Sequence, residues 1–173
     1  MNVGILGSAF NPPSMGHADL INQALSKFDW VYLVPSFKHA FGKEMAGYHE
    51  RCLLTQMFVK DLNFVSCSTL MVEDQVKTDG PVYTYDLLEL IQNIMPENKL
   101  NFIIGPDNAT NWHKFYRADE IKAKWGLFVG EEKTSIRSTQ LRQLIAKNQG
   151  IDGLTTSSVI AQITKKTLYG KQL

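Results

Sequence analysis

The stretch "NVGILGSAFNPPSMGH", residues 2–17, decides which kind of fold this chain adopts. Its first five residues form an apolar run of the kind that makes a buried strand. A loop of small residues and two consecutive prolines follows, and an amphipathic helical pattern begins at His17. A strand that leads through such a loop into a helix brings the free N–H groups of the helix to the end of the strand. This position is therefore a candidate anion site.

The same alternation of apolar runs and helical patterns continues along the chain. It predicts βαβ units, and apolar runs without polar alternation predict strands that are buried on both faces. We therefore expect an α/β fold, a Rossmann-like doubly wound parallel sheet of about five strands with helices on both faces. We also expect one domain over 1–173, with the C-terminal helices from about residue 138 packed on it. Strands are predicted at 2–6, 30–34, 64–69, 100–105 and 125–130, and helices at 17–28, 49–60, 84–94, 107–122, 138–147 and 157–167.

Composition and charge exclude several classes of protein. The 173 residues carry 18 Lys and Arg against 17 Asp and Glu, and this net charge of +1 creates no field that would attract nucleic acid or an anionic membrane. No apolar run approaches the length of a membrane span. Met1 runs directly into an apolar stretch, so we expect no signal peptide and a cytoplasmic protein. Cys52 and Cys67 make no disulfide framework and are expected in the core.

The loop after the first strand can be compared with two common phosphate-binding motifs. The dinucleotide fingerprint G-x-G-x-x-G is absent from "GILGSA", and neither Gly-Lys pair, at 42–43 and 170–171, is followed by the Ser or Thr of a P-loop. A third interpretation is a loop that ends in Ser14-x-Gly16-His17, where Gly16 lets a phosphate approach the backbone and His17 donates to it. The alternative is a plain turn with a helix-capping Ser14 and a solvated histidine.

Five ordered motifs support the third interpretation and make it more specific. The chain resembles the bacterial nicotinate mononucleotide adenylyltransferases, in the wider group of HxGH nucleotidyltransferases, over nearly its whole length. The matching stretches are "GSAFNPPSMGH" (7–17), "PSFKHAFGK" (35–43), "YTYDLL" (83–88), "FIIGPDNATNWHKFYRADEI" (102–121) and "IRSTQLR" (136–142). The tail at 159–169 also has the family's character.

The chain departs from the family's pattern at four places. Ser14 replaces the first histidine of HxGH, and Arg137 replaces the first serine of the I-S-S-T motif. Phe115 stands where the family usually has a tryptophan that stacks on the pyridine ring. The stretch between Val129 and Ile136 is shorter than in the family.

The resemblance implies an adenylyl transfer from ATP to nicotinate mononucleotide, which yields the nicotinate adenine dinucleotide and pyrophosphate in NAD biosynthesis. The attacking phosphate is already an anion, so the reaction needs positioning and charge neutralisation rather than a general base. The sequence has no cluster of His, Cys or carboxylates with metal-ligand spacing. We therefore expect no protein metal site and expect Mg²⁺ to bind through the ATP phosphates.

The resemblance also implies the site residues. The catalytic group is Ser14, His17, Lys43 and Arg142. The ATP-binding group is Gly7, Ser8, Ala9, Phe10, Gly16, His17, Gly105, Asp107, Ile136, Arg137, Ser138, Thr139 and Arg142. The substrate-binding group is Asn11, His39, Lys43, Thr84, Asp107, Trp112, Phe115 and Tyr116. Structural roles compete for several of them, such as helix capping for Asp107 and core packing for the aromatic residues.

Other functions stay open at this point. Nicotinamide mononucleotide or pantetheine phosphate could replace nicotinate mononucleotide as the acceptor. A non-catalytic nucleotide-binding module is a different class, in which Ser14 and the short 130–136 segment mark weakened chemistry. The expected partners are small molecules, ATP and a pyridine mononucleotide, rather than nucleic acid or membranes. A homo-oligomer is compatible with the sequence.

Overall fold

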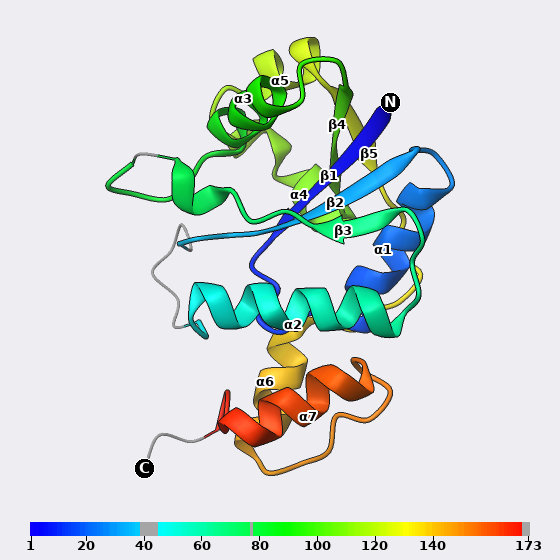
Figure 1. Ribbon diagram of the computed structural model, residues 1–173, viewed down its shortest axis with the longest axis vertical. Coiled ribbons are helices and arrows are strands. Elements are labelled where there is room, and N and C mark those ends of the chain that lie inside the picture. Colours follow the sequence, from blue (N-terminus) through cyan, green and yellow to red (C-terminus); the bar gives the residue numbers. More distant parts are fainter. Residues whose placement is uncertain (39–44, 77, 171–173) are drawn as a thin grey trace.

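The computed structural model describes residues 1–38, 45–76 and 78–170. Five parallel strands form one sheet in the order β3-β2-β1-β4-β5. Their bounds are β1 Asn2–Ser8, β2 Trp30–Pro35, β3 Cys67–Thr69, β4 Lys99–Ile104 and β5 Gly126–Val129. This arrangement confirms the predicted doubly wound parallel sheet of five strands (Figure 1).

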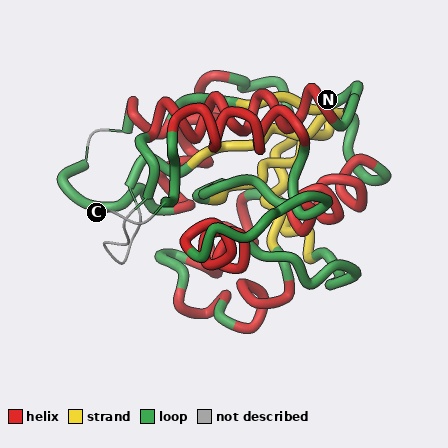
Figure 2. Tube along the Cα trace, turned by 90° about the horizontal axis from the view of Figure 1, so that it is seen from below, coloured by secondary structure: helices red, strands yellow, loops and turns green. Residues whose placement is uncertain are grey.

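Helices cover both faces of the sheet and complete two cores (Figures 1 and 2). Alternate residues along β1 divide between these cores, because successive side chains of a strand point to opposite faces. Leu6 packs in one core with residues of α1, α2, α6 and α7, whereas Val3 and Ile5 pack in the other with residues of α3 and α5. The helices are α1 Met15–Leu25, α2 Tyr48–Asp61, α3 Thr84–Ile94, α4 Pro106–Thr110, α5 Ala118–Lys124, α6 Ser138–Ala146 and α7 Ser157–Lys166.

Three elements differ from the prediction. Helix α1 begins at Met15 instead of His17, because Ser14 has extended dihedral angles and is the N-cap. Strand β3 covers only the last three of the six predicted residues, and Val65, in the part that is not strand, is 89% exposed. The helical pattern at 107–122 divides into α4, a 3-10 turn at Trp112–Lys114 and α5. A second 3-10 turn covers Glu73–Gln75.

The strand order creates a switch point beside β1. The chain moves from β1 to β2 on one side, and β4 pairs with β1 on the other. The loops that leave β1 and β4 therefore diverge at neighbouring strand ends, where open α/β sheets bind their ligands. Cys52 and Cys67 are both buried and unpaired, as expected.

Candidate functional site

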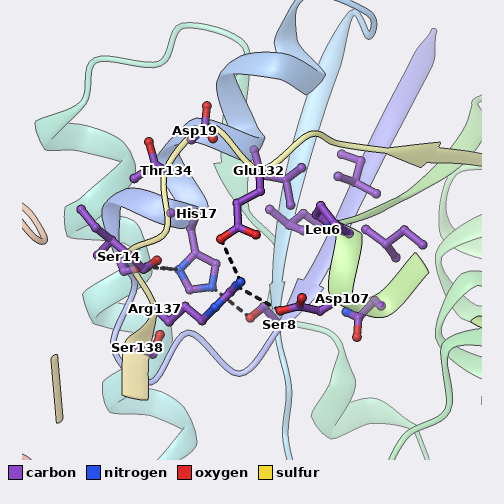
Figure 3. Close-up of a pocket in the computed structure, with 18 of the residues that line it drawn as sticks. Leu6, Ser8, Ser14, His17, Asp19, Asp107, Glu132, Thr134, Arg137 and Ser138 are labelled. Atoms are coloured by element: carbon purple, nitrogen blue, oxygen red, sulfur yellow. Dashed lines mark hydrogen bonds and ion pairs between the residues drawn. The ribbon is translucent and has the colours of Figure 1, made fainter. Parts of the chain in front are cut away.

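A pocket of about 280 Å³ lies at this switch point (Figure 3). It is enclosed by the ends of β1 and β4, the first turns of α1, α4 and α6, and the segment that joins β5 to α6. The lining residues are Leu6, Gly7, Ser8, Ser14, Gly16, His17, Asp19, Leu20, Ile103, Ile104, Gly105, Pro106, Asp107, Asn108, Glu131, Glu132, Thr134, Ile136, Arg137 and Ser138.

The hydrogen bonds of His17 fix its tautomer. The backbone N–H of Ser14 donates to His17 Nδ1 at 3.0 Å, so Nδ1 is unprotonated and the ring proton lies on Nε2. Nε2 lies 3.1 Å from the Ser8 hydroxyl, at the end of β1. Figure 3 shows the ring between Ser14 and Ser8, inside the pocket. The neutral imidazole therefore presents an N–H donor to the pocket.

Burial keeps this histidine neutral. It lowers the pKa of His17 from 6.5 to about 4, because desolvation disfavours the charged ring. The ring also packs against Phe10, with the ring centroids 4.8 Å apart. His17 is thus a donor by virtue of its tautomer, and not by carrying a positive charge.

The loop between β1 and α1 is held by side chains from distant parts of the chain. The carbonyl oxygen of Ala9 accepts from Arg51 at 2.7 Å, and that of Asn11 accepts from Arg142 at 2.8 Å. Ser138 Oγ donates to the carbonyl of Pro12 at 2.6 Å, and Thr155 Oγ1 donates to that of Pro13 at 2.8 Å. Four consecutive or near-consecutive carbonyl groups of the loop are therefore hydrogen-bonded within the protein, and these bonds fix the position of the loop.

Gly16 sits where two segments of the pocket wall meet. A Cβ atom at this position would overlap the carbonyl oxygen of Ile136. Ser14 Oγ also donates to that oxygen at 3.4 Å. The start of α1 and the segment before α6 are therefore in direct contact, and this requires glycine at position 16.

An ion-pair bridge crosses the mouth of the pocket. Arg137 lies 3.1 Å from Asp107 and 3.0 Å from Glu132, and it is half exposed (Figure 3). The bridge joins the start of α6 to the start of α4 and to the segment after β5. Because all three side chains are solvated, the bridge itself adds little to stability. Arg137 can exchange its carboxylate partners for a phosphate.

Arg51 is the buried cation behind the first loop. Its side chain is 1% exposed, and its nitrogen atoms donate to the carbonyls of Ala46 at 2.8 Å, Ala9 at 2.7 Å and Phe37 at 3.4 Å. The buried carboxylate of Glu73 accepts from the backbone N–H of Phe37 at 2.7 Å. This pair of residues ties the loops after β1 and β2 together, so the role of Arg51 here is structural.

The buried position of Glu73 predicts a pH dependence of stability. Burial raises the pKa of Glu73 from 4.5 to about 7, although Arg51 opposes the shift. The folded state therefore favours the protonated acid, and the stability this gives is present below pH 4.5 and is lost as the pH rises toward 7. Glu73→Gln mimics the protonated acid. Its unfolding free energy relative to wild type should rise by about 1–3 kcal/mol between pH 4.5 and 7.

Urea titrations at a series of pH values measure this difference. Asp74→Asn is the control, because Asp74 is the exposed neighbour on the same turn and the change removes the same charge. A difference between Glu73→Gln and wild type that stays constant with pH would show that the buried carboxyl group does not titrate in this range.

The structure gathers most, but not all, of the predicted ATP-binding residues. Gly7, Ser8, Gly16, His17, Gly105, Asp107, Ile136, Arg137 and Ser138 line the pocket, together with Ser14 of the predicted catalytic group. Ala9, Phe10, Thr139 and Arg142 do not. Phe10 is fully buried in the core, and Arg142 turns to the carbonyl of Asn11 and the hydroxyl of Thr139. In the structure the contacts of Arg142 hold the loop after β1, and its role in ATP binding stays a prediction.

Among the described residues, the predicted substrate residues other than Asp107 do not line the pocket. Asn11 is 5% exposed, and its Oδ1 accepts from the backbone N–H of Ala46. Trp112 and Phe115 stack with ring centroids 4.7 Å apart and pack partly buried against the second core. Thr84 is the first residue of α3. His39 and Lys43 lie outside the described residues.

Two exposed tyrosines complete this aromatic region. The rings of Tyr83 and Tyr116 are tilted with centroids 5.0 Å apart, and both residues are 49% exposed. Of the two, the resemblance implied only Tyr116 as a substrate-binding residue. The indole Nε1 of Trp112 is buried and has no hydrogen-bond partner among the described residues. It is therefore a free donor beside the predicted pyridine site.

Sequence reasoning missed several pocket residues. These are Leu6, Asp19, Leu20, Ile103, Ile104, Pro106, Asn108, Glu131, Glu132 and Thr134. Leu20 is placed by its helix, three residues after His17, and such spacing on one helix face could have indicated it. No sequence pattern indicated Glu131 and Glu132 as pocket residues, because an acidic pair after a strand usually lies in solvent.

The described residues contain no group of three or more His, Cys, Asp and Glu side chains that could hold a metal ion. No helix in the described ranges is both long and apolar enough to cross a membrane.

Comparison with known proteins gives consistent matches. The model of the cytidylyltransferase-like family matches residues 5–162. A crystal structure from Vibrio parahaemolyticus, assigned as a nicotinate-nucleotide adenylyltransferase, has 37% identity and a TM-score of 0.88 over 100% of this chain and 98% of that one. A curated relative with the same assignment from Lactiplantibacillus plantarum is 29% identical, over 96% of this chain and 87% of its own.

Two more distant matches agree with these. A relative from Anaeromyxobacter sp. (strain K), again assigned as a nicotinate-nucleotide adenylyltransferase, is 27% identical over 96% of both chains. A Plasmodium falciparum nicotinic acid mononucleotide adenylyltransferase, solved in complex with NaAD, has 17% identity and a TM-score of 0.76 over 97% of both chains. At this identity the likeness concerns the fold alone.

Proposed function

Because this chain belongs to the cytidylyltransferase-like family, we propose that it transfers the adenylyl group of ATP to nicotinate mononucleotide. An oxygen of the mononucleotide phosphate forms a bond to the α-phosphorus of ATP. The bond between the α-phosphorus and the oxygen that bridges it to the β-phosphate breaks, and pyrophosphate leaves. The product is the nicotinate adenine dinucleotide of NAD biosynthesis. The reaction needs no proton transfer, so it needs no general base.

The observation that carries this proposal is the neutral His17, whose Nε2–H faces the pocket beside Ser8. A fixed N–H donor at a strand end suits the phosphate oxygens on which charge develops in the transition state. The first turns of α1 and α6 border the same pocket and offer their free N–H groups and dipoles. All of these groups are oriented before substrate binds, which is what positional catalysis requires.

The two ends of the pocket suit the two ends of ATP. The phosphates would lie at Ser8, His17 and Ser138, where donors and helix N-termini converge. The adenine would lie at the apolar end, against Leu20, Ile103 and Ile104. Arg137 would leave Asp107 and Glu132 for the phosphates, and Asp107 would then be free to accept from a ribose hydroxyl. Each role makes use of a group that the apo structure already places in the pocket.

The pocket fits a magnesium ion that arrives with the triphosphate. No group of three acidic, histidine or cysteine side chains is assembled among the described residues, so a cage made by the protein alone is not indicated there. Mg²⁺ keeps several waters and commonly binds through substrate phosphates plus one or two carboxylates. Bound in this way it would neutralise phosphate charge. The carboxylates that line the pocket are those of Asp19, Asp107, Glu131 and Glu132, and one or two of them could complete its coordination.

A single assay tests the proposed function. Purified protein is given ATP and nicotinate mononucleotide, and pyrophosphate release is followed. Replacement of ATP by CTP tests the nucleotide, and replacement of the acceptor by pantetheine phosphate tests the other adenylyltransferase activity that the sequence allows. Turnover with neither acceptor, in a protein that still binds ATP, would favour a nucleotide-binding module.

The acceptor should be the acid rather than the amide. Thr84 offers a hydroxyl donor, the backbone near Tyr116 offers N–H groups, and Trp112 Nε1 is a buried donor without a partner. A carboxylate can accept from such donors, whereas the NH₂ group of an amide leaves one of them unpaired, at about 1–3 kcal/mol. We expect kcat/KM to favour nicotinate mononucleotide over nicotinamide mononucleotide by about tenfold to a hundredfold.

The measurement is kcat/KM for each mononucleotide at saturating ATP. Trp112→Phe keeps an aromatic ring but removes the indole donor, and it should narrow the preference. Equal kcat/KM values in the wild type would contradict the assignment of these donors, while the adenylyl transfer itself would still stand.

A further inference from the structure

One wall of the pocket has little secondary structure to hold it. The segment between β5 and α6 contributes Glu131, Glu132, Thr134 and Ile136 to the lining. The backbone N–H of Gly130 still donates to the carbonyl of Ile104 at 2.9 Å, which extends the β4–β5 pairing. Over the described chain, no backbone–backbone hydrogen bond holds residues 131–136. Something else must therefore fix this wall.

Side chains of α1 take over this task. Gln23 Nε2 donates to the carbonyl of Glu131 at 2.9 Å, and the N–H of Glu131 donates back to Gln23 Oε1 at 2.8 Å. Asp19 Oδ2 accepts from the N–H of Lys133 at 3.2 Å. Asp19 and Gln23 are four residues apart, so they lie on one face of α1. Both contacts join α1 to a segment more than 100 residues later in the chain.

Only a carboxamide can make both contacts of Gln23 at once. The backbone of Glu131 presents one donor and one acceptor, and a side-chain amide is the group that complements both. A carboxylate at this position would still accept from the N–H of Glu131. It has no proton to donate to the carbonyl oxygen of Glu131, so that contact would be lost and would become repulsive. The packing is close here, because a Cβ on Gly130 would overlap Leu20, which itself lines the pocket.

We propose that Gln23, supported by Asp19, is a positioning residue for ATP. It touches no reacting atom. It holds residues 131–133 against α1, so that the pocket keeps the width that the nucleotide requires between Leu20 and the segment after β5. This inference rests on the proposed function in taking ATP as the ligand. It assigns to α1 a second role beside that of His17.

Gln23→Glu is the sharpest test, because it keeps the length of the side chain, removes the donor and adds one negative charge, which the control below also adds. The matched control is Asn22→Asp, an exposed neighbour on the same helix that undergoes the same change from amide to carboxylate. The KM for ATP and the calorimetric Kd for ATP should rise about tenfold for Gln23→Glu, the size expected when a pair of hydrogen bonds is lost. The kcat and the KM for nicotinate mononucleotide should stay within about twofold of wild type. Asn22→Asp should match wild type in all four quantities.

A second variant guards against misfolding. Gln23→Met also keeps the length but carries no polar group, and it should show the same selective loss of ATP affinity with an unchanged melting temperature. Equal ATP affinity in Gln23→Glu, Gln23→Met and Asn22→Asp would overturn the inference. A parallel loss for both substrates together with a lower melting temperature would also overturn it, because it indicates a merely structural role.

The calorimetric measurement of ATP binding tests this inference independently of the proposed function. Calorimetry needs no turnover, so a wild-type chain that binds ATP but releases no pyrophosphate would contradict the proposed function and leave the comparison of variants intact. A wild-type chain that binds no ATP would overturn both.

Discussion

Replacing His17 with alanine is expected to lower kcat by about 10²–10³ while the fold stays intact, because one preorganised donor to the developing phosphate charge is lost. The side chain is partly buried at the first turn of α1, and its Nδ1 accepts from the N–H of Ser14. Alanine leaves that N–H without its acceptor, so a small loss of stability accompanies the kinetic effect. Steady-state kinetics with ATP and nicotinate mononucleotide give kcat and KM.

Two variants make the result specific. His17→Gln can place an amide N–H near the position of Nε2, so it should retain more activity than His17→Ala. His49→Ala removes an exposed histidine from α2 and should leave kcat unchanged. If folded His17→Ala turns over at the wild-type rate, His17 is not the catalytic donor.

The pKa of His17 adds a condition on pH. Since burial depresses the pKa to about 4, the ring of the free enzyme stays neutral throughout the range from about pH 5.5 to 8. The kcat/KM profile should therefore show no titration of His17 in that range. Between about pH 6.5 and 4 the unfolded chain binds a proton at this residue that the folded chain resists, so the contribution of His17 to stability is lost as the pH falls through this range.

Arg51→Met is expected to produce the largest loss of stability, about 3–5 kcal/mol in the unfolding free energy. The change removes the donors to three carbonyl groups and leaves the buried Glu73 without the nearby cation. A lysine cannot replace arginine here, because the fork of the guanidinium reaches carbonyls in three loop positions at once. Urea denaturation at pH 8 measures the effect.

A second substitution separates charge from hydrogen bonding. Arg51→Met combined with Glu73→Gln should recover part of the loss, because the uncompensated charge is then absent. Lys60→Met on the same helix removes an exposed charge and should change the unfolding free energy by less than about 0.5 kcal/mol. An Arg51→Met protein as stable as Lys60→Met would contradict the proposed role of the buried cation.

The sequence predicts the sheet well because the strands that matter are buried on both faces. Runs such as 100–105 contain little besides apolar residues, and no other element accommodates such a run between turn signals. Strand β3 was predicted too long, since Val65 has strand-forming character but points into solvent. Propensity alone does not reveal where pairing with a neighbour ends.

The candidate site was predicted less completely, for a physical reason. Motif spacing located Ser8, His17 and Ser138 at strand ends and helix starts, where local geometry decides their place. The sequence does not predict the direction of the Arg142 side chain, because Arg142 lies one helical turn beyond Ser138 and its hydrogen bond to the carbonyl of Asn11 decides where it points. The role of Gln23 could not be predicted from the sequence either, because its hydrogen-bond partner Glu131 lies 108 residues later in the chain.

The hydrogen bonds that hold the loop between β1 and α1 have a consequence for the order in which the protein is synthesised and folds. Of the four carbonyl groups that fix this loop, three depend on Arg142, Ser138 and Thr155, which leave the ribosome after every strand of the sheet. A nascent chain that has reached residue 130 already carries the whole sheet and His17, but of the four donors to the loop carbonyls it contains only Arg51. The sheet can therefore form before the loop is ordered. A chain truncated before residue 138 would contain the whole sheet and His17 but would lack the contacts that hold the loop in its active position.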